Sequence, residues 1–271
     1  MKLCLNDIKD KKPDVKEEAL LCDKMHFDAK EAYKLLRTNI IYSSPDEKCR
    51  KIGITSANIG EGKSTVATNL SYSLSATKSR VLLLELDLRL PTLSKKLNIK
   101  YKYGLTDFLA GNVPESRIIY PTDKPNWDVI FSGVIPATPT ELINSQKLIT
   151  FIRRLEREYD FIVFDLPPVN VVSDALVAKE VIDGYVLVVR ENYSDRRSLI
   201  ECVRKLDFLS IPILGFVLVD SISKGGHYRK RHYGKYKNYY YYGKHHKRPK
   251  EVDKDNDWFP YSHTSFYGWW K

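Results

Sequence analysis

The residues best suited to chemistry stand in a glycine-bearing stretch, ANIGEGKST, at positions 57–65. It fits the pattern G-x-x-x-x-G-K-[ST], except that Ala57 takes the place of the first glycine. In such a loop the backbone N–H groups and the N-terminus of the following helix bind phosphate. We therefore expect Lys63 to reach the outer phosphates and Ser64 to place its hydroxyl on Mg²⁺. The expected nucleotide-binding residues here are Gly60, Glu61, Gly62, Lys63, Ser64 and Thr65.

Three acidic side chains stand at the ends of apolar runs that predict buried strands. Asp165 ends DFIVFD and precedes two prolines, which is typical of a carboxylate that holds Mg²⁺ directly or through water. Glu85 and Asp87 form a second acidic site, where one carboxylate could accept a proton from an attacking hydroxyl while the other holds the metal. Arg89 fits a functional role and a salt bridge equally well. The candidate catalytic residues are Lys63, Glu85, Asp87 and Asp165, and the candidate metal ligands are Ser64, Asp87 and Asp165.

These residues need a scaffold that brings strand ends together. Predicted strands at 51–55, 80–86, 129–131, 160–168, 185–189 and 213–219 alternate with predicted helices at 28–42, 64–77, 104–111, 140–158 and 195–209. Asp28 is a candidate cap of the first helix. The alternation predicts an α/β fold of the P-loop NTPase type, with a mostly parallel sheet flanked by helices. Ligands bind at the carboxyl ends of parallel strands, so the loop and the acids should converge.

Charge is distributed unevenly along the 271-residue chain. The formal net charge is +10, yet residues 224–250 hold ten Lys or Arg and no Asp or Glu, so the remainder is formally neutral. This argues against a protein built throughout for nucleic acid. We expect an N-terminal arm at 1–27, an ATP-binding domain at 28–223, and a basic, tyrosine-rich tail at 224–271 that is disordered in isolation.

Several features favour a cytoplasmic setting. The start, MKLCLNDIKDKK, lacks the apolar run of a signal peptide. No stretch approaches the ~20 apolar residues that a bilayer-spanning helix needs. The four cysteines form no disulfide or metal pattern, which suits a reducing compartment.

A family resemblance follows from the segments EAYKLLRTNI, TSANIGEGKST, VLLLELDLRLPTLS, SGVIPATPTELINS and YDFIVFDLPPV, followed by the tyrosine-rich tail. Together they resemble the bacterial tyrosine kinases (BY-kinases) of capsule and exopolysaccharide biosynthesis, over about residues 28–242. The resemblance implies ATP and Mg²⁺ as cofactors and phosphorylation of the tyrosine cluster in trans, within a ring-shaped homo-oligomer. It also implies a membrane activator, a polysaccharide co-polymerase whose cytoplasmic tail docks on the kinase at the inner face of the membrane. The pair would control polysaccharide chain length and export.

The resemblance also assigns roles to single positions. Lys63 and Ser64 match the family's Walker A contacts, Asp165 its Walker B acid, and Asp87 the second acid of its Walker A′ motif. Glu85 stands where the family usually has the first Walker A′ aspartate, the base or metal ligand. The expected phosphorylation sites are Tyr233, Tyr236, Tyr239, Tyr240, Tyr241 and Tyr242.

Two further family positions differ from the usual residue. Glu31, Lys34 and Arg37 match the oligomerisation motif E-x-x-R-x-x-R, with Lys34 in place of the first arginine. Their spacing alone also fits a solvated helix face. Asp220 follows the last predicted strand, where the family often has an asparagine near the adenine.

Two other functions fit the same residues. One is an ATP-hydrolysing switch that positions a cell-surface or division apparatus, although the related partition ATPases carry a signature lysine where this chain has Asn58. The other is a regulatory subunit that binds ATP but is catalytically weakened by Glu85. By composition alone the tail would also suit single-stranded nucleic acid or an anionic membrane. Beside a phosphate loop, we expect it instead to be the substrate of the kinase.

Overall fold

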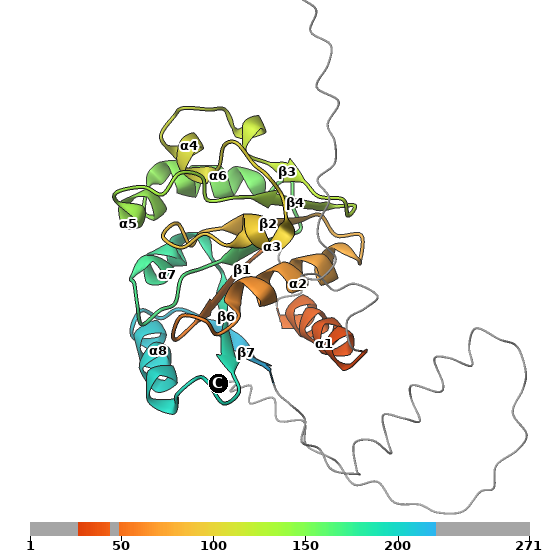
Figure 1. Ribbon diagram of the computed structural model, residues 1–271, viewed down its shortest axis with the longest axis vertical. Coiled ribbons are helices and arrows are strands. Elements are labelled where there is room, and N and C mark those ends of the chain that lie inside the picture. The colour runs from red at the N-terminus through yellow and green to blue at the C-terminus, as the bar shows by residue number, and fades with distance from the viewer. Residues whose placement is uncertain (1–26, 44–48, 221–271) are drawn as a thin grey trace, which may run out of the picture. The chain divides into compact units, whose positions relative to one another are not determined.

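A seven-stranded sheet forms the centre of the computed structural model, which describes residues 27–43 and 49–220 (Figure 1). The strand order is β3-β4-β2-β5-β1-β6-β7, and all neighbours are parallel except β3 and β4. The strands are β1 Arg50–Ser56, β2 Val81–Glu85, β3 Tyr120–Pro121, β4 Trp127–Ile130, β5 Phe161–Asp165, β6 Gly184–Arg190 and β7 Ile213–Val219. The predicted α/β fold is therefore confirmed, while the short antiparallel edge strand β3 was not predicted.

Helices cover both faces of this sheet. They are α1 Phe27–Ser43, α2 Lys63–Ser75, α3 Leu93–Leu97, α4 Leu105–Leu109, α5 Pro139–Ile143, α6 Gln146–Leu155, α7 Asp174–Val177 and α8 Arg196–Phe208, with 3₁₀ turns η2 Glu115–Arg117 and η3 Ala178–Val181. Alternate residues of β2 pack on opposite faces of the sheet. Leu82 and Leu84 join the core that includes α6 and α8, whereas Val81 and Leu83 join the core that includes α2. Burial on both faces explains the continuous apolar runs of the sequence.

Two predicted helix boundaries are wrong. The single helix expected at 140–158 is two helices, α5 and α6, because Ser145 starts a new helix by accepting a hydrogen bond from the backbone N–H of Leu148 at 3.2 Å. At the other end of the domain, α1 begins at Phe27, so Asp28 lies in its first turn and is not its N-cap.

The first helix, α1, packs beside α2 (Figure 1), and its Ile40 is buried in the core on that face. No helix within 27–43 and 49–220 combines the length and apolar character needed to cross a bilayer. Residues 1–26 of the predicted arm, the whole predicted tail and all six predicted phosphorylation sites lie outside the described residues, so those boundaries and sites stay predictions.

Candidate active site

The segment between β1 and α2, residues 57–62, has the backbone of a phosphate loop. Gly60 and Gly62 have φ of +80° and +95°, a region open to glycine but costly for other residues. Ala57 is not among the residues with positive φ, and it is buried in the core. An alanine is therefore acceptable where the usual pattern has glycine. Because α2 begins at Lys63, its first backbone N–H groups lack intrahelical partners and suit a phosphate.

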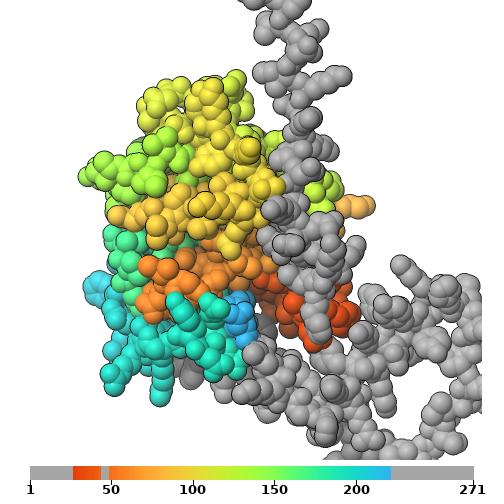
Figure 2. Space-filling view, in the orientation of Figure 1, coloured from red at the N-terminus to blue at the C-terminus, as the bar shows by residue number. Residues whose placement is uncertain are grey.

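Side chains at the end of β6 hold this loop from one side, and we call residues 190–194 the loop strap. Arg190 donates to the Gly60 carbonyl at 3.1 Å, and the Tyr193 hydroxyl donates to the Ile59 carbonyl at 3.2 Å. A Cβ at position 60 would stand 2.9 Å from the Tyr193 hydroxyl, so Gly60 is also needed for this approach. Figure 2 shows the orange surface of the loop beside the teal surface of the strap.

Glu61, which we expected to bind nucleotide, turns its side chain inward and is 1% exposed. One carboxylate oxygen accepts the backbone N–H of Asn58 at 2.8 Å. The other accepts the hydroxyl of Ser194, in the loop strap, at 2.5 Å. The side chain therefore braces the loop, and any contact with phosphate rests on the backbone N–H of Glu61.

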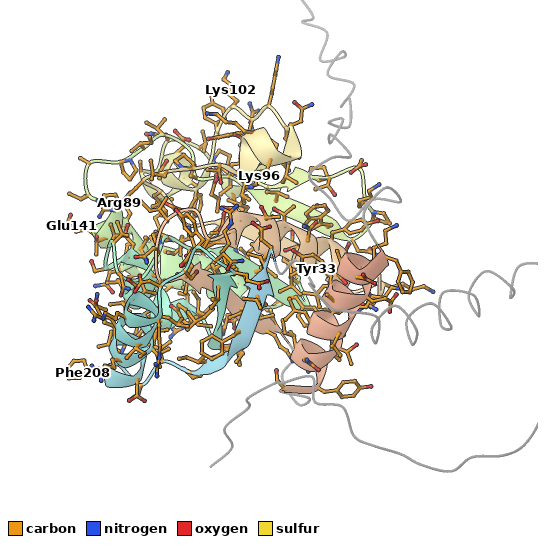
Figure 3. The ribbon with its side chains drawn as sticks, turned by 60° about the horizontal axis from the view of Figure 1, so that its bottom comes forward. Tyr33, Arg89, Lys96, Lys102, Glu141 and Phe208 are labelled. Carbon is orange, nitrogen blue, oxygen red and sulfur yellow. The ribbon has the colours of Figure 1, made fainter. Side chains whose placement is uncertain are left out.

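The short helix α3 contacts the start of α2. The Thr92 hydroxyl donates to the Ser64 hydroxyl at 3.1 Å, and the Lys96 ammonium, labelled in Figure 3, donates to the Thr65 hydroxyl at 2.9 Å. Lys63, the first residue of α2, is largely buried beside them. The two hydroxyls expected to meet metal and phosphate are thus positioned by α3, which the sequence analysis did not predict.

Asp165 ends β5, between β1 and β2 in the sheet. Its side chain is 1% exposed, and neither carboxylate oxygen has a hydrogen-bond partner among the described residues. Burial raises the pKa of Asp165 to about 7, although the nearby Ser64 hydroxyl and Lys63 ammonium oppose the shift. Leaving a buried carboxylate unpartnered is costly, so this arrangement suits a site completed by a cation.

Asp87 lies two residues beyond β2 and is joined to the end of β5 through its backbone, since its N–H donates to the Asp165 carbonyl at 3.0 Å. Its carboxylate accepts the Leu90 N–H at 3.1 Å. Burial raises the pKa of Asp87, and the positive charge of Lys63 acts against this. Asp87 and Asp165 are therefore brought to the same strand ends, as the sequence predicted.

Arg89 makes an ion pair with Asp174, a fully buried acid at the start of α7. Two guanidinium nitrogens donate to the two carboxylate oxygens at 2.7 and 3.1 Å, and the Thr140 hydroxyl donates to Asp174 at 2.6 Å. Of the two roles left open for Arg89, the structure supports the salt bridge, which ties the segment after β2 to α5 and α7.

Glu85, at the end of β2, is fully engaged by backbone donors. One carboxylate oxygen accepts the N–H groups of Thr92 and Leu93 at 2.6 and 2.8 Å, and the other accepts the Ser132 N–H at 3.1 Å. The side chain is 1% exposed, and burial raises its pKa against these hydrogen bonds. Glu85 thus fixes the start of α3 and the end of β4, and this geometry favours a positioning role over proton transfer.

Ser64, Asp87 and Asp165 together fit Mg²⁺ by their chemistry. Magnesium prefers hard oxygen ligands and usually takes one or two carboxylates, with water and substrate phosphates completing its octahedron. Asp165 supplies the buried carboxylate without a partner. Within the described part of the chain, no group of three or more His, Cys, Asp or Glu side chains could hold a metal alone. Water and the phosphates of a nucleotide would supply the remaining ligands of such a site.

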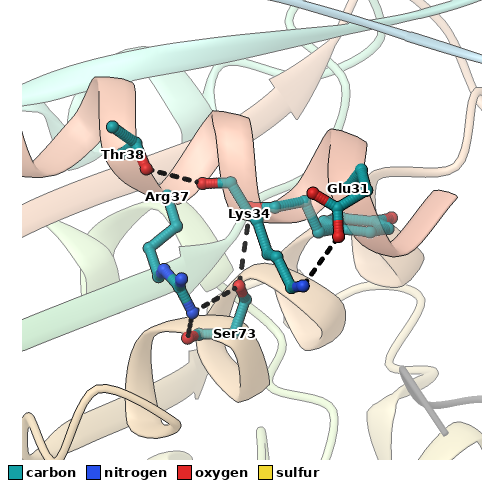
Figure 4. Close-up of polar contacts among 6 residues, drawn as sticks. Glu31, Lys34, Arg37, Thr38 and Ser73 are labelled. Atoms are coloured by element: carbon teal, nitrogen blue, oxygen red, sulfur yellow. Dashed lines mark hydrogen bonds and ion pairs between the residues drawn. The ribbon is translucent and has the colours of Figure 1, made fainter. Parts of the chain in front are cut away.

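The predicted oligomerisation residues lie on α1, where they make contacts within the chain (Figure 4). Lys34 donates to Glu31 at 2.7 Å on the exposed face of the helix. Arg37 donates to the Ser73 carbonyl at 2.8 Å, near the end of α2. Arg37 therefore joins α1 to α2 inside one copy, and a role of these residues between copies stays a prediction.

Asp220, the predicted adenine contact, directly follows β7 with φ of +55°. This left-handed conformation is unusual for residues other than glycine but is tolerated by Asp and Asn. This backbone conformation does not test the adenine contact, which stays a prediction.

Comparisons with known proteins show which family this chain resembles. Residues 49–201 match a family model described as an AAA domain. The chain is 32% identical over 188 residues to the tyrosine-protein kinase YwqD of Bacillus subtilis (strain 168), covering 69% of this chain and 79% of YwqD. The crystal structure of the chimerical protein CapA2B2 has a TM-score of 0.67 at 31% identity, covering 70% of this chain and 83% of that one. The septum site-determining protein MinD of Pyrococcus horikoshii OT3, complexed with Mg-ADP, has a TM-score of 0.56 at 29% identity, covering 65% and 72%.

Proposed function

Because this chain belongs to the bacterial protein-tyrosine kinases built on a P-loop, we propose that it phosphorylates tyrosines of its own C-terminal tail, in trans between copies. The observation that carries the proposal is the buried, unpartnered carboxylate of Asp165, close to Lys63 and Ser64. An intact phosphate loop beside such an acid is suited to Mg²⁺ and ATP. The proposed acceptors are the tail tyrosines that the sequence analysis named.

ATP would lie with its phosphates along the backbone N–H groups of residues 60–65. The loop strap and Glu61 hold these groups in place before the nucleotide arrives, which lowers the cost of ordering them. Lys63 would stabilise the negative charge that develops on the transferred phosphoryl group. Magnesium, when bound, neutralises charge on the phosphates. Ser64 and Asp165 would hold the metal ion, which leaves the Asp87 carboxylate for the proton.

The tyrosine hydroxyl must lose its proton during transfer, and we propose Asp87 as the acceptor of that proton. Glu85 is the other acid expected to do so, but its two carboxylate oxygens already accept three backbone N–H groups. Asp87 makes one such bond in the described structure. Burial raises the pKa of Asp87, which makes its carboxylate a better base than an exposed aspartate.

Phosphorylation would change the net charge of the tail. Residues 224–250 carry ten positive charges, and each phosphotyrosine adds about −1.5 to −2 charges at neutral pH. Modifying several of the seven tyrosines at 228–242 would therefore cancel most of the basic charge. We propose that this changes the association between copies. The same proposal includes a membrane co-polymerase as activator, and control of polysaccharide chain length and export as the outcome.

A second candidate is an ATP-hydrolysing switch, which the likeness to MinD favours. The two functions differ in the acceptor of the phosphoryl group, a tyrosine hydroxyl or water. They can be separated by incubating the wild-type chain and ATP with an excess of a mass-tagged Lys63→Met chain. We expect phosphotyrosine on the tagged chain, because transfer occurs in trans. Release of free phosphate without phosphotyrosine on either chain would favour the switch.

A further inference from the structure

Exposed apolar side chains surround the candidate site. The strands β4, β2, β5, β1 and β6 are consecutive in the sheet, and each is followed by a segment that carries at least one large, exposed hydrophobic residue. We call this set the apolar rim. Its members are Ile59, Leu90, Val134, Ile135, Val171 and Tyr193, all between 51% and 70% exposed.

Large exposed hydrophobic side chains are not spread over the whole surface of the described residues. The described residues include thirteen exposed large hydrophobic side chains, and six of them are in the rim. The other seven are confined to α1, α8 and β7. Five separate segments of different sequence therefore share one property at the carboxyl edge of the sheet. A concentration of exposed apolar residues at one place marks an interaction surface.

Side-chain charge around the rim is mixed, and two of its acids, Glu61 and Asp87, are buried. The five segments, residues 57–62, 86–92, 131–138, 166–173 and 191–195, contain four acidic residues and one basic residue. The basic residue is Arg89, which is paired with Asp174. Because the exposed side chains of the rim are large and hydrophobic, a partner suited to this edge is apolar or aromatic.

We propose that the rim binds the residues on either side of the acceptor tyrosine and thereby makes the kinase select tyrosines with aromatic neighbours. The inference rests on the proposed phosphorylation of tail tyrosines. A protein acceptor must bring its hydroxyl to Asp87 and Lys63 at the strand ends, so its neighbouring residues lie across the surrounding segments. The surface that they meet there is the rim.

The tail has the composition that this surface requires. Residues 233–242, YGKYKNYYYY, contain six tyrosines, two lysines and no acid, and every tyrosine has another within three positions. Whichever tyrosine enters the site, aromatic side chains are available on at least one side to cover apolar rim residues. The occupant that we commit to is such an aromatic-rich segment from a second copy of the chain.

Two peptides test the selection directly. Each copies residues 232–243 and keeps Tyr240 as its one tyrosine, while the other five tyrosines become Phe in the first peptide and Ser in the second. The enzyme is the full-length chain with all nine tyrosines of its tail, residues 224–271, replaced by Ser, so that the peptide is the intended acceptor. We expect kcat/KM to be about tenfold higher for the Phe peptide, through a lower KM, because apolar burial adds to its binding.

Variants of the rim and a control variant test whether the rim causes the preference for the Phe peptide. Val134→Ser combined with Ile135→Ser should reduce the tenfold preference to about threefold or less, with the affinity for ATP unchanged. Phe208→Ser is the matched control, because Phe208 is 85% exposed on α8 and lies away from Arg89 in Figure 3. It should keep the full preference. Melting temperatures of all variants show whether each is folded.

The outcomes separate this inference from the function on which it rests. Equal KM for the two peptides, or an undiminished preference in the rim variant, overturns the inference while phosphotyrosine on the peptides still supports the kinase. Loss of self-association in the rim variant with no change in KM would make the rim an interface between copies and would also overturn it. Absence of phosphotyrosine on both peptides and on the wild-type tail overturns the inference and the proposed function together.

Discussion

Replacing Glu85 tests whether this buried acid positions the site or takes the proton. Glu85→Ala removes the acceptor of three backbone N–H groups, at 2.6, 2.8 and 3.1 Å, in a place that is 1% exposed. Hydrogen bonds to charged groups are worth about 1.5–3 kcal/mol each, and unpaired buried donors are costly. Since such losses are not additive, we expect unfolding to become easier by about 4 kcal/mol. For a domain of this size the melting temperature would fall by roughly 10 °C.

The order of two conservative variants then separates the roles. Glu85→Gln keeps the side-chain length and a carbonyl acceptor for Thr92 and Leu93, but it brings an NH₂ group toward Ser132. Glu85→Asp keeps the charge, yet its carboxylate is withdrawn by about 1.5 Å, the length of one C–C bond, and cannot span both sets of donors. We therefore expect Glu85→Gln to retain at least as much stability and phosphotransfer activity as Glu85→Asp.

Thermal unfolding and phosphotyrosine formation across pH 6 to 9 measure the two properties side by side. A base or metal ligand at position 85 requires the reverse order of activity, because Gln cannot accept a proton at this pH. The positioning account would be refuted by an Asp variant as active as wild type, together with a stable but inactive Gln variant.

Three further predictions follow from other contacts. Burial raises the pKa of Asp165 to about 7, above the value of 3.8 for the unfolded chain. Because the folded state favours the protonated carboxyl, the nucleotide-free protein should lose up to about 4 kcal/mol of stability as pH rises from 4 to 7. Asp165→Asn should flatten this dependence in urea unfolding, and an unchanged slope would contradict the shift. Tyr193→Phe removes the hydroxyl that holds the Ile59 carbonyl, a bond worth about 1 kcal/mol, so the Kd for ATP should rise about fivefold in a fluorescent-nucleotide titration. Tyr42→Phe, on α1, is its control and should leave the Kd unchanged. Arg37→Ala breaks the bond to the Ser73 carbonyl and should destabilise the domain by about 1–2 kcal/mol in chemical unfolding. Unaltered stability with a smaller particle in light scattering would instead place Arg37 between copies.

The fold and the centre of the site were predictable because their signals are local. A strand buried on both faces is a continuous apolar run, as in residues 81–85, and glycines at 60 and 62 mark the phosphate loop. Asp165 could be placed because strand ends of a parallel sheet meet at one edge. These features depend on a few neighbouring residues each.

The contacts that brace the site were not predictable, because they join distant segments. Glu85 is held by backbone N–H groups at 92, 93 and 132. Almost every residue type has a backbone N–H, so the sequence does not reveal which of these groups bind a side chain. The loop strap reaches the phosphate loop from about 130 positions away. Ser145 divided a predicted helix because its capping role depends on whether the chain turns there. Each of these contacts depends on how distant segments of the chain pack together.

The central claim is that this chain places phosphate on its own tail tyrosines, and intact mass combined with peptide mapping tests it most directly. The purified full-length chain is incubated with Mg²⁺ and ATP beside Lys63→Met, with and without the cytoplasmic segment of the proposed membrane partner. The account predicts several additions of phosphate that map to residues 233–242 in the wild type, and none in Lys63→Met. Bound ATP without phosphotyrosine in any of these mixtures would contradict it.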